Sequence, residues 1–417
     1  MSWDSADAMR PPAMGRRPPL RRIGLDSMGS LLLTRLLGRL EQGTLAIELP
    51  SGATVEFRGA DCGLESRLTL YRWRALGRLM RKGDLGFAES YMAGDWSTAN
   101  LATLLELLLR NETALEPAWQ GLSGARLASR LRHRARANSL RGSRRNIEAH
   151  YDLGNAFYAS WLDRDMNYSS ALYADPGLTL EQAQIAKLDR AIALLGAKPS
   201  DHVLEIGCGW GALAERLAVH QGCRVTGITL SNEQLTFARE RLRRSGVGER
   251  ATIRLQDYRT VHEKFDAIIS IEMLEAAGEA YWPMFFRKLH DSLVPGGRAV
   301  LQVITIEESR FDDYRSRPDF IQRYIFPGGL LPTNTAILRQ LSATGLKLHL
   351  VERFSASYAR TLAEWRARFS RANATPAEAL RDADSFRRMW NYYLAYCEAG
   401  FRTGALDVAL YQISREL

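Results

Sequence analysis

The chain has 417 residues, more than one average domain requires, so two or three domains are expected. Hydrophobic residues make up 46% and charged residues 25%, a balance typical of a globular protein with a large core. No stretch approaches the roughly 20 apolar residues that span a bilayer. Residues 1–22 lack the apolar core of a signal peptide, so we expect a disordered tail and no export. The four cysteines are scattered without metal-ligand or disulfide spacing, which favours a reducing cytoplasm and predicts no metal site.

Residues 23–125 are predicted to form an N-terminal domain that engages a membrane or a partner subunit. Short strand-like stretches at residues 45–49 and 54–57 mix with helical ones. Residues 101–109 (LATLLELLL) are apolar almost all round, which predicts a buried helix.

A basic linker is predicted over residues 126–147, where the positive charge of the chain is concentrated. Lys and Arg outnumber Asp and Glu by 56 to 47, and the segment between Arg126 and Arg145 holds eight arginines and no carboxylate. Three interpretations stay open: a solvated linker, attraction to an anionic lipid surface, or attraction to nucleic acid. No aromatic residue interrupts the segment, so the stacking partners of a single-strand binder are missing. We therefore expect no nucleic-acid partner.

Residues 148–417 are predicted to form one α/β catalytic domain. Apolar strand-like stretches alternate with stretches of helical periodicity, which predicts a doubly wound parallel sheet. Such sheets bind ligands at the carboxyl ends of their strands. The predicted strands span residues 202–207, 224–230, 251–257, 265–271 and 295–306, and the predicted helices span residues 180–195, 212–220, 232–244 and 281–293.

A glycine-rich segment, EIGCGWG at residues 205–211, follows the first predicted strand and precedes a helix. Its glycines permit a tight turn and close approach of the backbone to a ligand, but dinucleotide enzymes use such loops too. The second strand ends in TLSNEQ at residues 229–234, without the acid that would hold a nicotinamide ribose. The third ends in Gln256-Asp-Tyr258, an acid and an aromatic that could grip an adenine. This combination resembles class I S-adenosylmethionine (SAM) methyltransferases.

Longer motifs lie on both sides of this loop. They are HYDLGN at residues 150–155, MNYSS at 166–170, FDAIIS at 265–270, Glu275, YIFPGG at 324–329 and Tyr358, with LGFAESYMAGDW at 85–96 nearer the N-terminus. In this order they resemble the cyclopropane fatty acid synthase family, which includes the mycolic acid cyclopropane synthases and related lipid C-methyltransferases. The resemblance runs from about residue 75 to the C-terminus. It implies a Rossmann-like class I SAM-methyltransferase fold, with a seven-stranded sheet and a smaller, mostly helical N-terminal domain.

The resemblance also implies a set of SAM-binding residues. Two would lie against the methionine moiety, three glycines would line the loop beneath it, three residues would lie near the ribose and two would approach the adenine. In that order they are Tyr168 and Ser169; Gly207, Gly209 and Gly211; Thr229, Leu230 and Gln234; and Asp257 and Tyr258.

In the family a bicarbonate ion is thought to act as the base, and the resemblance implies five positions that would hold it. Glu275 and Tyr358 match the family, and Ile304 falls at its backbone contact. Ser170 stands where the family has cysteine, and Gln302 where it has histidine. Ala276 likewise replaces a histidine usual after the glutamate. A glutamine cannot take up a proton near neutral pH, so the departures suggest an altered base.

The resulting hypothesis is methyl transfer from SAM to the double bond of an unsaturated phospholipid acyl chain. A carbocation would form, and redirected proton loss would give a methyl-branched unsaturated chain. A true cyclopropane synthase is the alternative, and a methyltransferase on a small soluble acceptor or a non-catalytic SAM-binding protein is more remote. The resemblance further implies a homodimer, and with the basic segment it suggests a cytoplasmic protein held at the inner face of the membrane.

Overall fold

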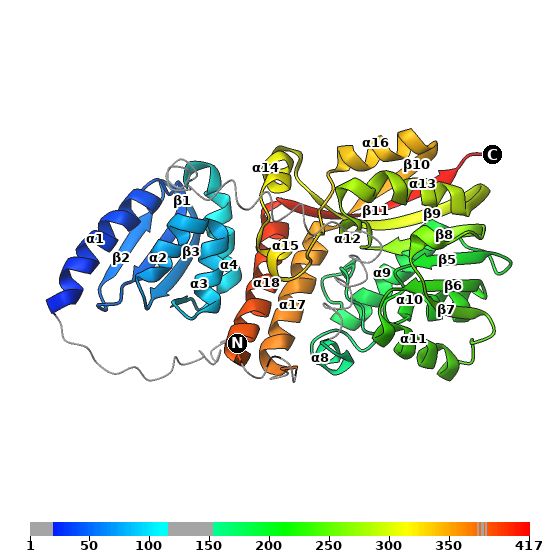
Figure 1. The fold of residues 1–417 in the computed structure, drawn as a ribbon, viewed down its shortest axis with the longest axis horizontal. Helices are drawn as coiled ribbons and strands as arrows, with labels where there is room; N and C mark the ends of the chain where they lie inside the picture. Colours follow the sequence, from blue (N-terminus) through cyan, green and yellow to red (C-terminus); the bar gives the residue numbers. More distant parts are fainter. Residues whose placement is uncertain (1–19, 116–152, 373–374, 377–378, 380–381) are drawn as a thin grey trace. The chain divides into compact units, whose positions relative to one another are not determined.

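The computed structural model describes residues 20–115, 153–372, 375–376, 379 and 382–417. The predicted basic linker, nearly all of the predicted N-terminal tail and the start of the HYDLGN motif lie outside these residues. The chain divides into two compact units, Met1–Arg126 with Asp382–Ala399 and Leu127–Arg381 with Gly400–Leu417 (Figure 1). In the described part of the chain, no helix is both long and apolar enough to cross a bilayer.

The first unit contains a four-stranded sheet with the order β2-β1-β3-β4. Strand β1 pairs antiparallel with β2 and parallel with β3, while the two-residue β4 pairs antiparallel with β3. The strands are β1 (Gln42–Glu48), β2 (Thr54–Arg58), β3 (Asp61–Leu70) and β4 (Trp96–Ser97), and the helices are α1 (Leu20–Leu37), α2 (Arg74–Lys82), α3 (Asp84–Met92) and α4 (Leu101–Arg110). Helices outweigh strands in this unit, as predicted.

The predicted buried helix of the first unit is α4. Four of its leucines, Leu101, Leu104, Leu105 and Leu107, lie in the core. Its first turn is capped by the Asn100 side chain, which accepts a hydrogen bond from the Thr103 N–H at 3.2 Å. The tight turn before β4 holds a buried carboxylate: Asp95 is fully buried and pairs with the guanidinium groups of three arginines, Arg72, Arg74 and Arg78. The AGDW end of the sequence motif is therefore a structural element of this unit.

The helix α18 (Ala383–Thr403) contributes residues to both units. Within the first unit, its Asn391 side chain donates to the Tyr91 hydroxyl at 2.7 Å, and the ring of Tyr392 lies 5.8 Å from the Tyr91 ring. The Arg388 guanidinium lies over the same tyrosine ring. The aromatic residues of α18 thus pack with α3.

The second unit contains the predicted doubly wound sheet, with seven strands in the order β10-β11-β9-β8-β5-β6-β7. Strands β5 to β9 are parallel, and β11 runs antiparallel to both of its neighbours. The strands are β5 (His202–Ile206), β6 (Arg224–Thr229), β7 (Ala251–Leu255), β8 (Phe265–Ile271), β9 (Leu293–Ile306), β10 (Leu346–Arg353) and β11 (Leu406–Arg415). Each of the five predicted strands is confirmed to within about two residues at either end.

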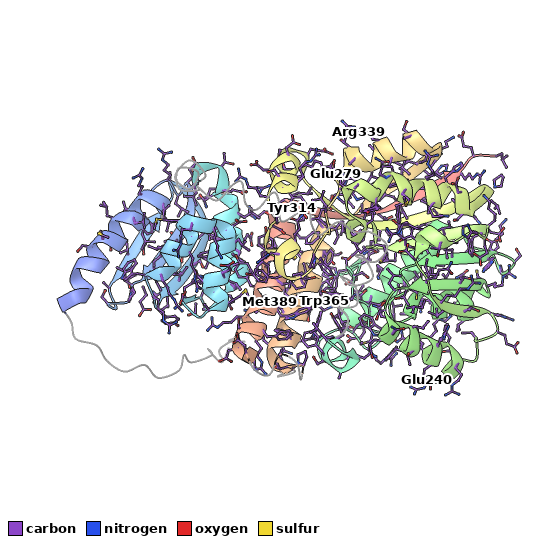
Figure 2. The ribbon with its side chains drawn as sticks, viewed as in Figure 1. Glu240, Glu279, Tyr314, Arg339, Trp365 and Met389 are labelled. Atoms are coloured by element: carbon purple, nitrogen blue, oxygen red, sulfur yellow. The ribbon has the colours of Figure 1, made fainter. Side chains whose placement is uncertain are left out.

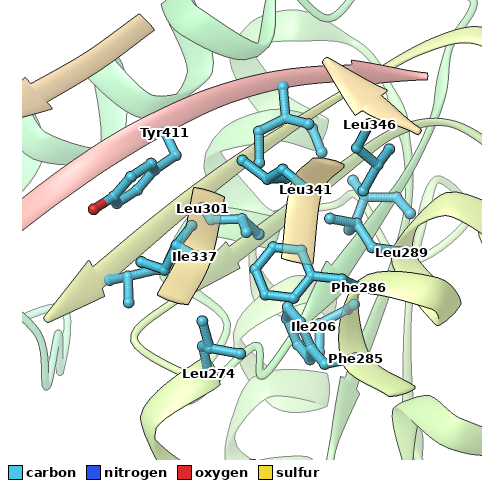
Figure 3. Packing of buried hydrophobic residues seen from close by; sticks show 14 of the residues in the cluster. Ile206, Leu274, Phe285, Phe286, Leu289, Leu301, Ile337, Leu341, Leu346 and Tyr411 are labelled. Atoms are coloured by element: carbon cyan, nitrogen blue, oxygen red, sulfur yellow. The ribbon is translucent and has the colours of Figure 1, made fainter. Parts of the chain in front are cut away.

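One face of this sheet carries a large apolar cluster. Phe286 of α13 (Trp282–Ser292) and Leu341 of α16 (Asn334–Thr344) pack over Leu301 and Tyr411 of the central strands (Figure 3). Side chains alternate along a strand, so Gln412 points to the opposite face, where it donates to the Leu194 carbonyl of α9 (Leu180–Leu195) at 2.8 Å. Helices therefore cover both faces of the sheet.

Candidate active site

The glycine-rich loop lies between β5 and the short helix α10 (Ala212–Arg216). Gly207, Gly209 and Gly211 all have positive φ angles, of 83°, 51° and 86°. A Cβ atom at residue 207 would lie 2.3 Å from the Met273 side chain, and one at residue 211 would lie 2.9 Å from Ala238. Beside Gly209 nothing lies within 4 Å of the Cβ position. The loop therefore needs glycine for its turn, and at Gly209 it leaves open space where a cofactor can approach the backbone.

The next strand, β6, ends in neutral polar groups. The buried Thr229 hydroxyl donates to Gln234 Oε1 at 2.7 Å, and Leu230 follows it half-buried. Ser231 caps α11 (Asn232–Arg244) by accepting from the Gln234 N–H at 3.3 Å. No carboxylate follows this strand until Glu233, so its end offers hydroxyl and amide groups to a ribose.

The end of β7 places an acid beside an aromatic ring, as the sequence predicted. Asp257 forms an ion pair with Arg259 at 2.6 Å, which the sequence did not indicate. Tyr258 meets the ring of Phe285 edge to face at 5.3 Å, and burial raises the pKa of its phenol to about 12. Asp257 keeps acceptor capacity beyond its bonds to Arg259, because a carboxylate offers about four lone-pair sites.

Tyr168 and Ser169 lie in different surroundings although they are neighbours. Tyr168 packs among aromatic rings, with Trp161 and Trp365 both at 5.5 Å; Trp365 comes from α17 (Ser355–Ala372) (Figure 2). The Ser169 hydroxyl accepts a hydrogen bond from the Lys187 ammonium at 2.7 Å. Tyr168 therefore belongs to an aromatic wall, and Ser169 to a polar cluster.

Lys187 of α9 is a buried cation that the sequence analysis did not single out. Burial lowers the pKa of its ammonium group to about 8, although attraction by Glu272, Asp163 and Glu205 opposes this shift. Burial also raises the pKa of Glu205, the first residue of the glycine-rich segment, to about 8. The helical periodicity around Lys187 gave no sign that a charged group would be buried there.

The predicted base-site residues converge on a carboxylate that the sequence analysis did not name, that of Glu272. Its Oε1 accepts from the Ser170 backbone N–H at 2.9 Å and from the Gln302 side-chain amide at 2.7 Å. Its Oε2 accepts from the Tyr358 hydroxyl at 2.7 Å. Three of the five predicted positions are thus brought together by one carboxylate.

The other two predicted positions bond to each other. The Ile304 N–H donates to Oε1 of Glu275, a buried side chain on α12 (Leu274–Ala277). The second carboxylate oxygen of Glu275 is buried and has no hydrogen-bond partner among the described residues. Burial, helped by the nearby charge of Glu272, raises the pKa of Glu275 to about 8. Near neutral pH this group therefore holds a proton.

Glu272 differs from Glu275 in how well its charge is stabilised. Burial raises its pKa, whereas the hydrogen bonds from Ser170, Tyr358 and Gln302 and the charge of Lys187 lower it. The hydrogen bonds that Glu275 accepts come from backbone groups, and a like charge lies beside it. Hydrogen bonds to the charged form favour that form, so Glu272 is the member of the pair that carries the negative charge. Such a carboxylate beside a neutral acid can accept a proton from a bound substrate.

The side chain of Ser170 does not reach this carboxylate. Its hydroxyl donates to the Ala171 carbonyl at 2.9 Å, and only its backbone N–H is directed at Glu272. The one signal that could have revealed Glu272 is its position directly after the buried strand β8, at the edge of the sheet where ligands bind.

Comparison with known proteins identifies the relatives of this chain. The family described as mycolic acid cyclopropane synthetase matches residues 138–412. The tuberculostearic acid methyltransferase UfaA1 of Mycobacterium tuberculosis is 38% identical over 98% of this chain and 96% of its own length. The cyclopropane-fatty-acyl-phospholipid synthase of Escherichia coli K12 is 36% identical over 81% of this chain and 84% of its own.

A solved structure adds the cofactor. The mycolic acid cyclopropane synthase CmaA1, complexed with SAH and CTAB, superposes with a TM-score of 0.61 and 30% identity, covering 65% of this chain and 98% of that one. SAH is what remains of SAM after methyl transfer, and the open space at Gly209 and the neutral end of β6 fit such a cofactor. The chain therefore belongs to the mycolic acid cyclopropane synthetase family and is a SAM-dependent methyltransferase of lipid chains.

Proposed function

We propose that this enzyme methylates the double bond of unsaturated acyl chains in membrane phospholipids and releases a methyl-branched unsaturated chain. The observation that carries the proposal is Gln302, which is fully buried and donates to Glu272 at the position where the family resemblance calls for histidine. An amide can orient an anion but cannot take up a proton near neutral pH. The groups that receive the proton are therefore rearranged, and the position of the base decides which proton leaves.

The site also suits a cationic reaction. SAM supplies an electrophilic methyl group, and an alkene that attacks it becomes a carbocation at the neighbouring carbon. Water must be kept away from that cation, and aromatic faces stabilise it. Trp161 and Trp365 are fully buried, and Tyr358 is nearly so. These rings give the second unit an apolar aromatic wall that excludes water and leaves Glu272 and Glu275 as the acid–base groups.

The lipid substrate is proposed from the relatives. One is named for cyclopropane-fatty-acyl-phospholipid synthesis and another for tuberculostearic acid methylation. The net charge of +9 and the arginine-rich segment would draw the protein to the anionic inner face of the membrane. We further expect a homodimer, in which two basic segments engage one membrane.

Expression in a bacterium that lacks its own cyclopropane synthase tests the proposal. Gas chromatography and proton NMR of the fatty acids separate the products, which have the same mass. A vinyl proton retained beside a new methyl group is the expected result. Strongly shielded ring protons would instead establish a cyclopropane synthase, an alternative that the retained pair of Glu275 and Ile304 favours. If no lipid gained a CH2 group although the protein bound SAM, the acyl-chain substrate would be abandoned.

A further inference from the structure

The surroundings of Glu272 indicate which group acts as the base, given the function proposed above. Glu272 follows β8 with a φ angle of 52°, one of two non-glycine residues with positive φ in the described chain. Its carboxylate is anchored on both oxygens, and its N–H donates to the Gln302 carbonyl at 2.8 Å. An L-residue is held in this backbone region only when its surroundings impose it, and such residues cluster at functional sites.

The donors that would hold a separate bicarbonate are already engaged. By family resemblance, the anion would be held at positions 170, 302 and 358. In this chain the Ser170 N–H, the Gln302 amide and the Tyr358 hydroxyl all bond to Glu272. A bicarbonate ion at the same place would lose these donors and would lie beside a like charge. The site as built therefore does not fit bicarbonate.

We propose that Glu272 is itself the base of the reaction and replaces the separate anion. The π electrons of the alkene form the new C–C bond to the methyl group, and the bond between that methyl and the sulfonium sulfur breaks, leaving its electron pair on sulfur. The neighbouring chain carbon becomes a cation. The Glu272 carboxylate then accepts a proton from a carbon beside the cation, and the C–H electron pair forms the new double bond. The proton passes to solvent when the product leaves.

The remaining groups of the cluster support this role. Lys187 lies close enough to stabilise the negative charge of Glu272 electrostatically, and Glu275 remains protonated near neutral pH, so it does not compete for the proton. Hydrogen bonds to both oxygens hold the Glu272 carboxylate in place. The chain thus supplies a base in a fixed position.

The test compares Glu272→Gly and Glu272→Gln with the wild-type enzyme, using vesicles of monounsaturated phosphatidylglycerol in buffer freed of carbon dioxide. The positive φ angle suits glycine, so Glu272→Gly removes the carboxylate without backbone strain. We expect wild-type SAH formation to be unaffected by bicarbonate removal. Both variants should lose at least about 100-fold in kcat/KM. Added bicarbonate should restore activity in part to Glu272→Gly, whose cavity admits it, and not to Glu272→Gln, whose amide fills the space.

The control is Glu279→Gln, which removes a carboxylate seven residues away that pairs with Arg315 at the surface and should leave activity unchanged. Calorimetric SAM binding and thermal melting show that each variant is folded. A wild-type enzyme that needs bicarbonate, or a Glu272→Gly variant that keeps full activity without it, would overturn the inference. Carbon-13 NMR of labelled bicarbonate tests for binding of this ion independently of turnover. Saturable binding by the wild-type protein would also overturn the inference that Glu272 replaces bicarbonate. Failure of wild-type vesicle methylation, by contrast, contradicts only the proposed function.

Discussion

Tyr358 on α17 donates its hydroxyl to Oε2 of Glu272 at 2.7 Å, across 86 residues of sequence. The tyrosine is 6% exposed, and its ring stacks on Phe401 at 4.4 Å, so its position is fixed by packing. Because this hydroxyl stabilises the ionised carboxylate, it lowers the pKa of Glu272 against the effect of burial. A residue of α17 therefore influences the protonation state of the proposed base.

Replacing Tyr358 by phenylalanine should reduce kcat by about 10-fold to 100-fold, since a hydrogen bond to a charged group contributes about 1.5–3 kcal/mol. Loss of the donor raises the pKa of Glu272, so the acidic limb of the pH–rate profile should move to higher pH. A pH series of kcat/KM measures this shift. The control, Tyr411→Phe, removes a hydrogen bond to Asn334 elsewhere in the core and should leave the profile in place. An unshifted profile for Tyr358→Phe would show that the tyrosine acts only through packing.

Restoring the family residues in the double variant Ser170→Cys with Gln302→His should move the product toward the cyclopropane. A histidine at this buried position can hold or exchange a proton near neutral pH, which the amide cannot. Proton NMR of the extracted fatty acids gives the ratio of ring protons to vinyl protons. An unchanged ratio in an active double variant would count against redirected proton loss at these positions.

Replacing Lys187 by methionine should destabilise the second unit by about 3–5 kcal/mol, because it leaves buried carboxylates without their cation. Lys187 is 1% exposed and donates to Ser169 at 2.7 Å, so its loss also frees that hydroxyl. Urea unfolding measures the change. The matched control is Lys347→Met, an exposed lysine 3.7 Å from Glu416, where surface pairs contribute at most about 1 kcal/mol. Equal effects of the two substitutions would contradict the account of a buried charge cluster.

Replacing Glu275 by glutamine should stabilise the protein increasingly from pH 5 to pH 8. The carboxyl pKa rises from its ordinary value to about 8 on folding, so in this window the native state holds a proton that the unfolded state releases. The wild-type free energy of unfolding therefore falls as pH rises, and the variant lacks this loss. The difference in the free energy of unfolding between the variant and the wild type should reach about 1 kcal/mol or more at pH 8, since one pKa unit corresponds to about 1.4 kcal/mol. Melting curves across this range test it, and a difference that does not widen with pH would refute the assigned protonation state.

The central sheet was predictable because its signals are local. Strands β5 to β9 are buried apolar runs next to helices with regular periodicity, and Gly207 to Gly211 mark the turn between β5 and α10. Strands β10 and β11 were not identified individually. The first is an edge strand in which leucines alternate with charged and polar residues. In the second, the apolar run Val408–Tyr411 is only four residues long and lies between polar residues.

The candidate site was predictable only through single residues matched to family motifs. Those matches assigned Tyr358, Gln302 and Ser170 to one site, and in the structure all three bond to one carboxylate. They could not reveal what lies at that site, because Glu272 reaches it through an unusual backbone angle and through partners 30 to 102 residues away. Lys187 was not identified for a related reason. The face of α9 that carries it becomes buried only when the helix packs against the folded sheet.

Because helix α18 contributes residues to both units, neither unit corresponds to one continuous segment of the chain. The residues of this helix up to Ala399 belong to the first unit, and from Gly400 they belong to the second, where Phe401 stacks on Tyr358. Removing everything before the linker would leave Asn391 and Tyr392 without their partner Tyr91. In evolutionary terms, the N-terminal unit cannot be discarded by shortening the gene at its start alone. Its loss must be matched by new residues on a helix near the opposite end of the protein, the same helix that carries the Phe401 ring stacked on Tyr358.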